Sequence, residues 1–146
     1  MARDWGDDMY AARIELIFDA GHRLLKYKGE CEAPHGHTFK AEIILSSEKL
    51  DQTGFVVDFV ELRDKIGGWI DENWDHAFLA NEDDKELIDA LNLLKEKKIF
   101  IFHNQNPTAE VMAKYLYDYV YKLYGDLVSK VRIWESPNQY AEYFKR

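Results

Sequence analysis

Three of the five histidines of the chain lie in one short stretch, as His22, His35 and His37. A single residue separates His35 from His37, and on a β-strand this spacing places both side chains on the same face. A third imidazole nearby would complete a three-nitrogen site with an open fourth position, which is the pattern of catalytic zinc. The alternative is a pair of solvated loop histidines and a core histidine at position 22. Cys31 favours the metal site, because reactive groups cluster at functional sites.

Two segments of alternating apolar and polar residues flank the loop that carries Cys31. The alternation predicts one half-buried strand over residues 12–20 and another over residues 36–46. Glycine and proline mark the stretch 23–34 between them as a loop. The two strands are therefore expected to pair in antiparallel fashion, with histidines at the loop end of each. That arrangement would bring His22 towards the His35–His37 pair.

The rest of the chain predicts two long amphipathic helices and several short elements. Asp58 and Thr108 are of the residue types that cap helix N-termini, and Gly125 is of the type that ends a helix. In chain order, the expected elements are a helix over 59–73, a short helix within 81–98, a short strand over 98–103, a helix over 109–124, and strands over 130–135 and 139–144.

This order of elements predicts an α+β fold in which two long helices cover one face of a four-stranded antiparallel sheet. The other sheet face and the sheet edges would stay open, and free edges invite pairing with other chains. A symmetric homo-oligomer is the expected solution. The length of 146 residues suits a single domain, expected over 11–146, after a flexible leader over 1–10.

Composition excludes several classes of protein. The net charge of -8 and the pI near 5.1 argue against a general nucleic-acid binder, which needs a basic face. The sequence has no run of 18 apolar residues, so no membrane span is expected. Its N-terminus lacks the apolar segment of a signal peptide. Because one cysteine cannot form an internal disulfide, a reducing compartment, the cytoplasm, is expected.

Six motifs appear in a fixed order between about residues 14 and 143. They are FDAGHRL, CEAPHGH, VDF, WDHAFL, NPTAE and WESP. Each is weak alone, but together they resemble the 6-pyruvoyl-tetrahydropterin synthase superfamily, and specifically its 6-carboxy-tetrahydropterin synthase branch of queuosine (7-deazaguanine) biosynthesis. The resemblance implies the tunnelling fold, in which subunits join their sheets into an oligomeric barrel. The usual assembly is a hexamer made of two trimers.

The resemblance also implies a role for each matching residue. The implied zinc ligands are His22, His35 and His37. The implied catalytic residues are Cys31, as the general base, and the dyad formed by Asp75 and His76. The implied pterin-binding residues are Thr108 and Glu135. The implied cofactor is Zn²⁺. The chain departs from close relatives at Ala109, where they carry a second hydroxyl, so a hydrogen bond to the pterin is lost or made by the backbone there.

The implied substrate is 7,8-dihydroneopterin triphosphate. Three residues separate Cys31 from His35, which resembles the carboxy-forming branch. That branch cleaves the side chain to give 6-carboxy-5,6,7,8-tetrahydropterin, acetaldehyde and triphosphate. The alternatives are triphosphate elimination to 6-pyruvoyl-tetrahydropterin, or a non-catalytic pterin- or zinc-binding protein of the same fold. Pure binding needs no base, so Cys31, Asp75 and His76 favour an enzyme.

Structural roles remain open for several of these residues. The alternatives are a small buried residue at Cys31, a helix-end cap at Asp75 and His76, and a polar strand residue at Glu135. The basic residues of the same region, Arg23, Lys26 and Lys28, are surface charges or contacts for the triphosphate. His103 matches no motif and is expected to be structural.

Overall fold

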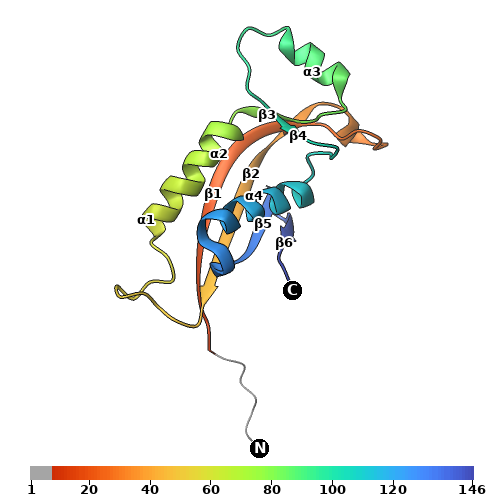
Figure 1. Cartoon of the computed structure of the whole chain (residues 1–146). Coiled ribbons are helices and arrows are strands. Elements are labelled where there is room, and N and C mark those ends of the chain that lie inside the picture. The colour runs from red at the N-terminus through yellow and green to blue at the C-terminus, as the bar shows by residue number, and fades with distance from the viewer. Residues whose placement is uncertain (1–7) are drawn as a thin grey trace, which may run out of the picture.

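The computed structural model describes residues 8–146, and its framework is one curled sheet of six strands (Figure 1). The strands lie in the order β4-β3-β1-β2-β5-β6. Their bounds are Tyr10–His22 for β1, His35–Ser47 for β2, Ala77–Asn81 for β3, Ile99–Phe102 for β4, Val128–Ser136 for β5 and Gln139–Tyr143 for β6. The α+β class is as predicted.

The predicted four-stranded antiparallel sheet is wrong, because β3 and β4 extend it as parallel strands. β3 pairs in parallel with β1 through Ala20 and Ala77, and β4 pairs in parallel with β3. β3 was not predicted from the sequence, because its five residues are all buried or half-buried and show no alternation of apolar and polar residues. A short apolar run of this kind cannot be distinguished from a buried helix segment by periodicity.

The long β1–β2 pair has the antiparallel register that the alternation predicted. Ile14 lies opposite Ile43, and His22 lies opposite His35 at the loop end. Side chains of alternate residues point to one face of a strand, so the apolar positions of both strands lie on one side of the sheet. Ile14, Phe18 and Ile43 are at most 2% exposed. The strands extend past the predicted ends and include His22 and His35.

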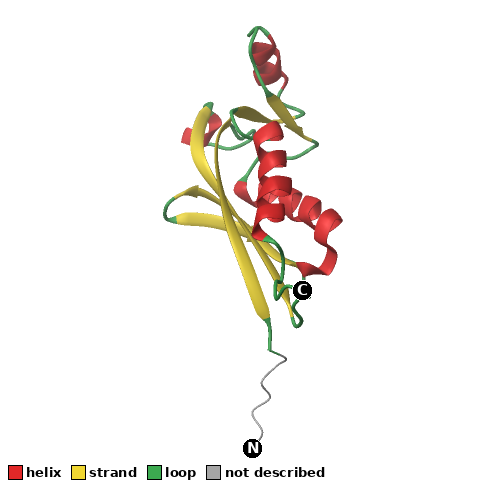
Figure 2. Ribbon diagram, turned by 90° about the vertical axis from the view of Figure 1, so that its left-hand side faces the viewer, coloured by secondary structure: helices red, strands yellow, loops and turns green. Residues whose placement is uncertain are grey.

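Two helical segments cover this apolar face of the sheet (Figure 2). The first is continuous and consists of α1 (Phe59–Leu62), a π-helical turn (Arg63–Gly67) and α2 (Gly68–Asn73). The second is α4 (Ala109–Tyr124), while the short α3 (Lys85–Asn92) projects beyond β3 and β4 (Figure 1). Within residues 8–146, none of the helices has the length and apolar character needed to cross a membrane.

The predicted caps set the starts and ends of these helices. The Asp58 carboxylate accepts hydrogen bonds from the N–H groups of Val60 and Glu61, and the Thr108 hydroxyl accepts one from Val111 N–H at 3.2 Å. Gly125 ends α4 with a φ of 58°, a left-handed conformation that favours glycine. The N-terminus of α4 is thereby fixed beside the histidine cluster.

The opposite face of the sheet carries paired charges. Glu42 is only 1% exposed although it lies on this face, because Arg13, Arg132 and Trp134 surround its carboxylate. Arg13 Nη1 donates to it at 3.2 Å, and the Trp134 indole N–H donates as well. Arg132 also binds Glu142 at 2.7 Å. These charges are paired within the chain, and the exposed apolar side chain of Ile17 lies on the same face.

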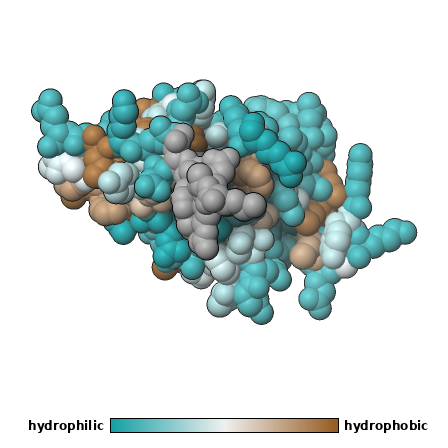
Figure 3. Space-filling model, turned by 90° about the horizontal axis from the view of Figure 1, so that it is seen from below, coloured by the Kyte–Doolittle hydropathy of each residue, from teal (hydrophilic) through white to brown (hydrophobic). Residues whose placement is uncertain are grey.

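The expected leader over residues 1–10 falls mostly on residues 1–7, which lie outside the described part of the chain. Of the remaining leader residues, Tyr10 already belongs to β1 and is about half exposed. Viewed from this end, the molecule is mostly hydrophilic, and apolar side chains gather in separate patches (Figure 3).

Candidate metal centre and active site

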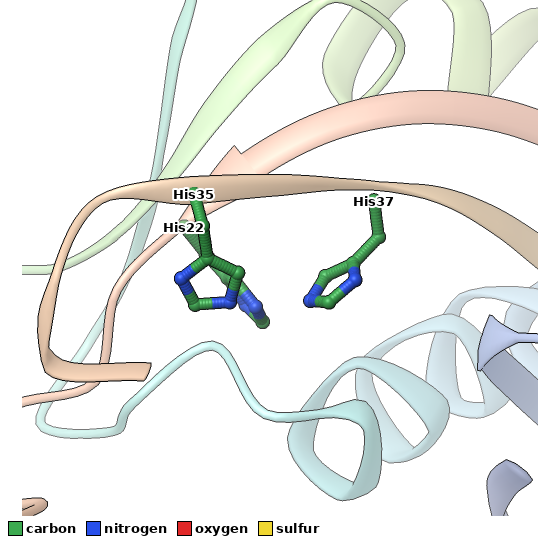
Figure 4. Close-up of side chains that lie close together, drawn as sticks. All are labelled: His22, His35 and His37. Carbon is green, nitrogen blue, oxygen red and sulfur yellow. The ribbon is translucent and has the colours of Figure 1, made fainter. Parts of the chain in front are cut away.

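The sheet brings the three histidines into one cluster. His22 is the last residue of β1, His35 is the first residue of β2 opposite it, and His37 lies two residues further along β2. One ligand atom from each imidazole lies within 4.8 Å of the other two. The rings converge beside the N-terminus of α4 (Figure 4). The predicted grouping of the three side chains is confirmed, and its size matches the reach of one metal ion.

Backbone carbonyls fix the tautomers of two of these histidines. His22 Nδ1 lies 2.7 Å from the Pro107 carbonyl oxygen, and His35 Nδ1 lies 2.8 Å from that of Ala33. A carbonyl oxygen only accepts, so each Nδ1 must carry the proton and each Nε2 must present a lone pair. Metal-binding histidines use this arrangement.

The residues present fit a metal ion. Over residues 8–146, three buried side-chain polar atoms lack a hydrogen-bond partner, and two of them are His35 Nε2 and His37 Nε2. Unpaired buried polar atoms are rare because each costs about 1–3 kcal/mol. A cation bound between the three imidazoles would explain why these two nitrogen atoms lack a hydrogen-bond partner. Three nitrogen ligands suit zinc with an open fourth position.

Burial in the cluster favours the neutral form of two of the imidazoles, His22 and His37. Burial lowers the pKa of His22 to about 4, and repulsion from His35 and His37 acts in the same direction, against the hydrogen bond to Pro107. Burial lowers the pKa of His37 as well, against the attraction of Glu135. The neutral imidazole is the form that binds a metal, so His22 and His37 are in the metal-binding form at neutral pH.

We expect the metal-free protein to lose stability as the pH falls from about 6.5 towards about 4. The unfolded chain protonates His22 near 6.5, whereas the folded chain does so only near 4. The stabilisation from the neutral imidazole is therefore complete above 6.5 and is lost as the pH falls to the folded pKa, a change of about 3 kcal/mol. Thermal unfolding of chelator-treated protein across this range measures it. A His22→Gln variant with the same pH slope as the parent would contradict the assignment.

Thr108 and Glu135 lie on the same side of the sheet as the histidines. Thr108 caps α4 directly after Pro107, whose carbonyl binds His22. Glu135 lines a hollow of about 180 Å³ together with Ala109, and a second hollow of about 400 Å³ together with His37. A carboxylate between two hollows beside the metal site can accept N–H donors from a planar ring. Ala109 contributes a buried methyl group to the smaller hollow.

Cys31 lies in a 3₁₀-helical turn, Glu30–Glu32, within the loop that joins β1 to β2. It is a half-buried free cysteine, and its carbonyl oxygen accepts a hydrogen bond from Leu24 N–H at 2.9 Å. The compact ligand group contains the three histidines and does not include this thiol. The geometry thus leaves the thiol available for a role other than metal ligand.

Asp75 and His76 form a dyad at the start of β3. His76 Nδ1 lies 2.9 Å from Asp75 Oδ2, and Asp75 Oδ1 accepts a hydrogen bond from Asp19 N–H at 3.0 Å. Burial opposes the charge on Asp75, but the hydrogen bonds from Asp19 and His76 outweigh it and lower the pKa of Asp75. His76 has a φ of 58°, and non-glycine residues in this left-handed region are enriched at functional sites.

The dyad lies close to the strand ends that carry His35 and His37. His76 lines an open cavity of about 620 Å³ together with Asp19 and Thr38, and His35 and His37 line the same cavity. Asp19 and Thr38 bind each other at 2.6 Å and alternate with Ala20 and His37, which point to the helix-covered side. Within residues 8–146 no hydrogen bond joins the dyad to the three imidazoles, although His76, His35 and His37 line the same cavity.

Two charged residues near the site have structural partners. Arg23, one of the possible triphosphate contacts, binds both carboxylate oxygens of the buried Asp84 at 2.7 and 2.5 Å. His103 pairs with Glu82 at 2.7 Å, away from the cluster. Lys26 and Lys28 stay exposed and remain candidates for the triphosphate.

Sequence reasoning missed the groups that orient the site. The carbonyl oxygens of Pro107 and Ala33 and the backbone of Asp19 act through main-chain atoms, which residue type does not reveal. The NPTAE motif was the available signal, since it includes Pro107, but its contact with His22 spans 85 residues of sequence.

Comparisons with known proteins extend over nearly the whole chain. Residues 12–146 match the family model described as 6-pyruvoyl tetrahydropterin synthase. A 6-carboxy-5,6,7,8-tetrahydropterin synthase of Rickettsia felis is 38% identical over 134 residues, which cover 89% of this chain and 95% of that protein. A putative 6-carboxy-5,6,7,8-tetrahydropterin synthase of Pyrococcus horikoshii is 33% identical over 137 residues, with 86% and 83% covered.

Solved structures share the fold at lower sequence identity. An uncharacterized protein of Wolinella succinogenes superposes with a TM-score of 0.79 at 23% identity, covering 94% of this chain and 99% of that chain. The 6-pyruvoyl tetrahydropterin synthase of Caenorhabditis elegans gives a TM-score of 0.71 at 21% identity, with 95% and 97% covered.

Proposed function

Because the chain belongs to the 6-pyruvoyl tetrahydropterin synthase family, we propose that it is a zinc-dependent 6-carboxy-5,6,7,8-tetrahydropterin synthase. The proposed reaction converts 7,8-dihydroneopterin triphosphate and water to 6-carboxy-5,6,7,8-tetrahydropterin, acetaldehyde and triphosphate, a step of queuosine biosynthesis. The observation that carries the zinc requirement is the cluster of three imidazoles, two of which, His35 and His37, have a buried Nε2 without a hydrogen-bond partner. The names of the relatives support the carboxy-forming branch.

His22, His35 and His37 would hold the zinc ion through their free nitrogens. A bound zinc ion supplies Lewis-acid polarisation of the substrate's side-chain hydroxyls, which makes the adjacent C–H more acidic. The His22 and His35 rings are held by their Nδ1–H bonds to backbone carbonyls, so their lone pairs stay directed into the cluster. The protein's contribution here is a fixed ligand geometry.

Cys31 would remove the acidified proton from the substrate carbon, since a thiolate is a competent base. To accept this proton, the thiolate does not need to contact the metal. Glu135 would accept two N–H donors from the aminopyrimidine edge of the pterin and so fix the ring beside His37. His76, oriented by Asp75, would return or accept a proton on the side-chain oxygens. Thr108 holds the start of α4 at the edge of this site.

Two alternative functions differ in what they produce. The pyruvoyl-forming reaction eliminates triphosphate and keeps all the side-chain carbons, whereas a non-catalytic pterin- or zinc-binding protein returns the substrate unchanged. The dyad at Asp75 and His76 argues against the non-catalytic alternative, because a protein that only binds has no need of an oriented imidazole. The distance in sequence from Cys31 to His35 favours side-chain cleavage.

Incubation of the zinc-loaded protein with 7,8-dihydroneopterin triphosphate, followed by product analysis by mass, tests the proposal. We expect 6-carboxy-tetrahydropterin and acetaldehyde in equal amounts. A product that retains all three side-chain carbons would identify the pyruvoyl-forming reaction, and unchanged substrate would identify a binding protein. The cytoplasmic location expected from the single cysteine remains a prediction.

We further propose that the active form is a homo-oligomer, a hexamer of two trimers joined through their sheets. The short strands β4 and β6 leave both edges of the sheet free in the single chain, and free edges pair. Asp19 and Thr38, which line the cavity beside His76, point to the sheet face opposite to that of His37, and on this ground we propose that each complete site combines a cluster from one subunit with Asp75 and His76 from a neighbour. Light scattering that gives a monomer at micromolar concentration would contradict this assembly.

Mixed oligomers test the shared site directly. Cys31→Ala and His76→Ala should each be nearly inactive alone, because each removes a proton-transfer group. After the two variants are unfolded together and refolded, some sites should combine an intact Cys31 with an intact His76 and regain activity. Activity that stays at the level of the separate variants, while light scattering shows mixed oligomers, would place both groups in one subunit.

A further inference from the structure

Asn106 holds the loop that carries Cys31 through both ends of its side-chain amide. Its Oδ1 accepts a hydrogen bond from Leu25 N–H at 2.9 Å, and its Nδ2 donates to the Leu25 carbonyl oxygen at 2.9 Å. The same Oδ1 also accepts from Asn81 Nδ2 at 3.2 Å. A side-chain amide offers a donor and an acceptor side by side, so the contact depends on residue type.

The two hydrogen bonds between the Asn106 amide and the Leu25 backbone, called here the Asn106 clamp, hold the loop next to a residue with a strained backbone conformation. Lys26, the next residue, has a φ of 61°, in the left-handed region that non-glycine residues rarely adopt. Such a conformation persists only where the surrounding structure imposes it. One residue before Leu25, Leu24 N–H binds the carbonyl oxygen of Cys31 at 2.9 Å. Asn106 is therefore linked to the backbone of Cys31 through two consecutive residues of the loop.

On its other side, Asn106 precedes the carbonyl group that orients His22. Pro107 accepts the Nδ1–H of His22 at 2.7 Å, and the Asn106 carbonyl oxygen accepts Thr108 N–H at 2.8 Å. The segment from Asn106 to Thr108 thus turns tightly just before α4. A shift of Asn106 would move the Pro107 carbonyl away from the imidazole and remove the contact that selects its tautomer.

We propose that Asn106 is a positioning residue that sets the His22 tautomer and the place of the Cys31 loop together. The inference deepens the proposed function, because it rests on His22 as a metal ligand and on Cys31 as a reactive group. Its role is exerted through Pro107 and Leu25, and the amide itself touches neither the metal ligands' free nitrogens nor the thiol. The Asn106 side chain thereby couples His22, just before the loop, to Cys31, near the other end of the loop.

Asn106→Asp tests the proposal with little change in size. The carboxylate can still accept from Leu25 N–H, but it places an acceptor against the Leu25 carbonyl, and the two oxygens repel. Long-range ¹⁵N NMR of the metal-free variant should show loss of the Nδ1–H tautomer at His22. Zinc affinity, measured by competition with a chelator, should fall by about 10–100-fold, the range for groups that orient a metal ligand.

Asn92→Asp is the matched control, because it adds the same charge at an exposed position at the end of α3. It should leave the His22 tautomer and the zinc affinity unchanged. If Asn106→Asp does not fold, Asn106→Ala, which removes the clamp without adding charge, gives the same readouts. An unchanged tautomer together with zinc affinity within twofold of the parent would overturn the proposal, even if the melting temperature falls. These readouts use no substrate, so failure of the proposed reaction would not affect them.

Discussion

Replacing Cys31 by alanine should leave one zinc per subunit and an intact oligomer while turnover falls by about 10²–10⁴-fold. This range is the usual effect of removing a positioned proton-transfer group. The structure supports the separation of roles, because the three histidines form a compact ligand group without the thiol, and a fourth protein ligand would close the position that the substrate needs. Zinc content by elemental analysis and turnover on the same preparation measure both quantities together.

Cys31→Ser provides the companion variant, since a hydroxyl of nearly the same size is a much weaker acid and stays protonated at neutral pH. It should fold and bind zinc like the parent and be about as slow as Cys31→Ala. Parallel loss of zinc and activity in Cys31→Ala would instead make the thiol a metal ligand. Full activity in either variant would remove Cys31 from the chemistry and leave it as a small half-buried residue of the loop.

Local pattern was sufficient to predict the centre of the fold. Alternation placed His22 on the same face as Ile14 and Phe18, and the antiparallel pairing of β1 with β2 then brought it opposite His35. The alternation of residues along each strand and the pairing of the two strands both involve residues that are near in sequence or joined by one loop. That is why the metal cluster could be predicted before the rest of the sheet was known.

Contacts between distant segments could not be predicted in the same way. β3 joins the sheet beside β1, and Ala77 pairs with Ala20 in parallel register. Alanine at these two positions gives no signal of a parallel pairing. The same limit applies to the Asn106 clamp, which joins segments 81 residues apart through an amide and a backbone. The motifs predicted Asp75 and His76 as a pair, but only the structure shows that His76 lines the same cavity as His35 and His37.

The structure also explains which histidine gives the cleanest test of the metal centre. His22 is 1% exposed and binds Pro107, and His35 binds Ala33, so replacing either would disturb packing or a backbone contact as well as the metal. His37 is half-buried and its Nε2 is unpaired. Its removal deletes a ligand with the least change elsewhere.

His37→Ala should therefore fold and yet contain far less than one zinc per subunit, with activity lost in proportion. Two imidazoles remain, and they cannot supply the three-nitrogen set that a catalytic zinc site uses. Zinc at 100 times its dissociation constant should stabilise the parent by about 2.7 kcal/mol and should not stabilise the variant detectably. His103→Ala is the matched control, because His103 is exposed and pairs with Glu82 outside the cluster, so this variant should keep its zinc. Full zinc content in His37→Ala would show that the metal, where present, is bound elsewhere.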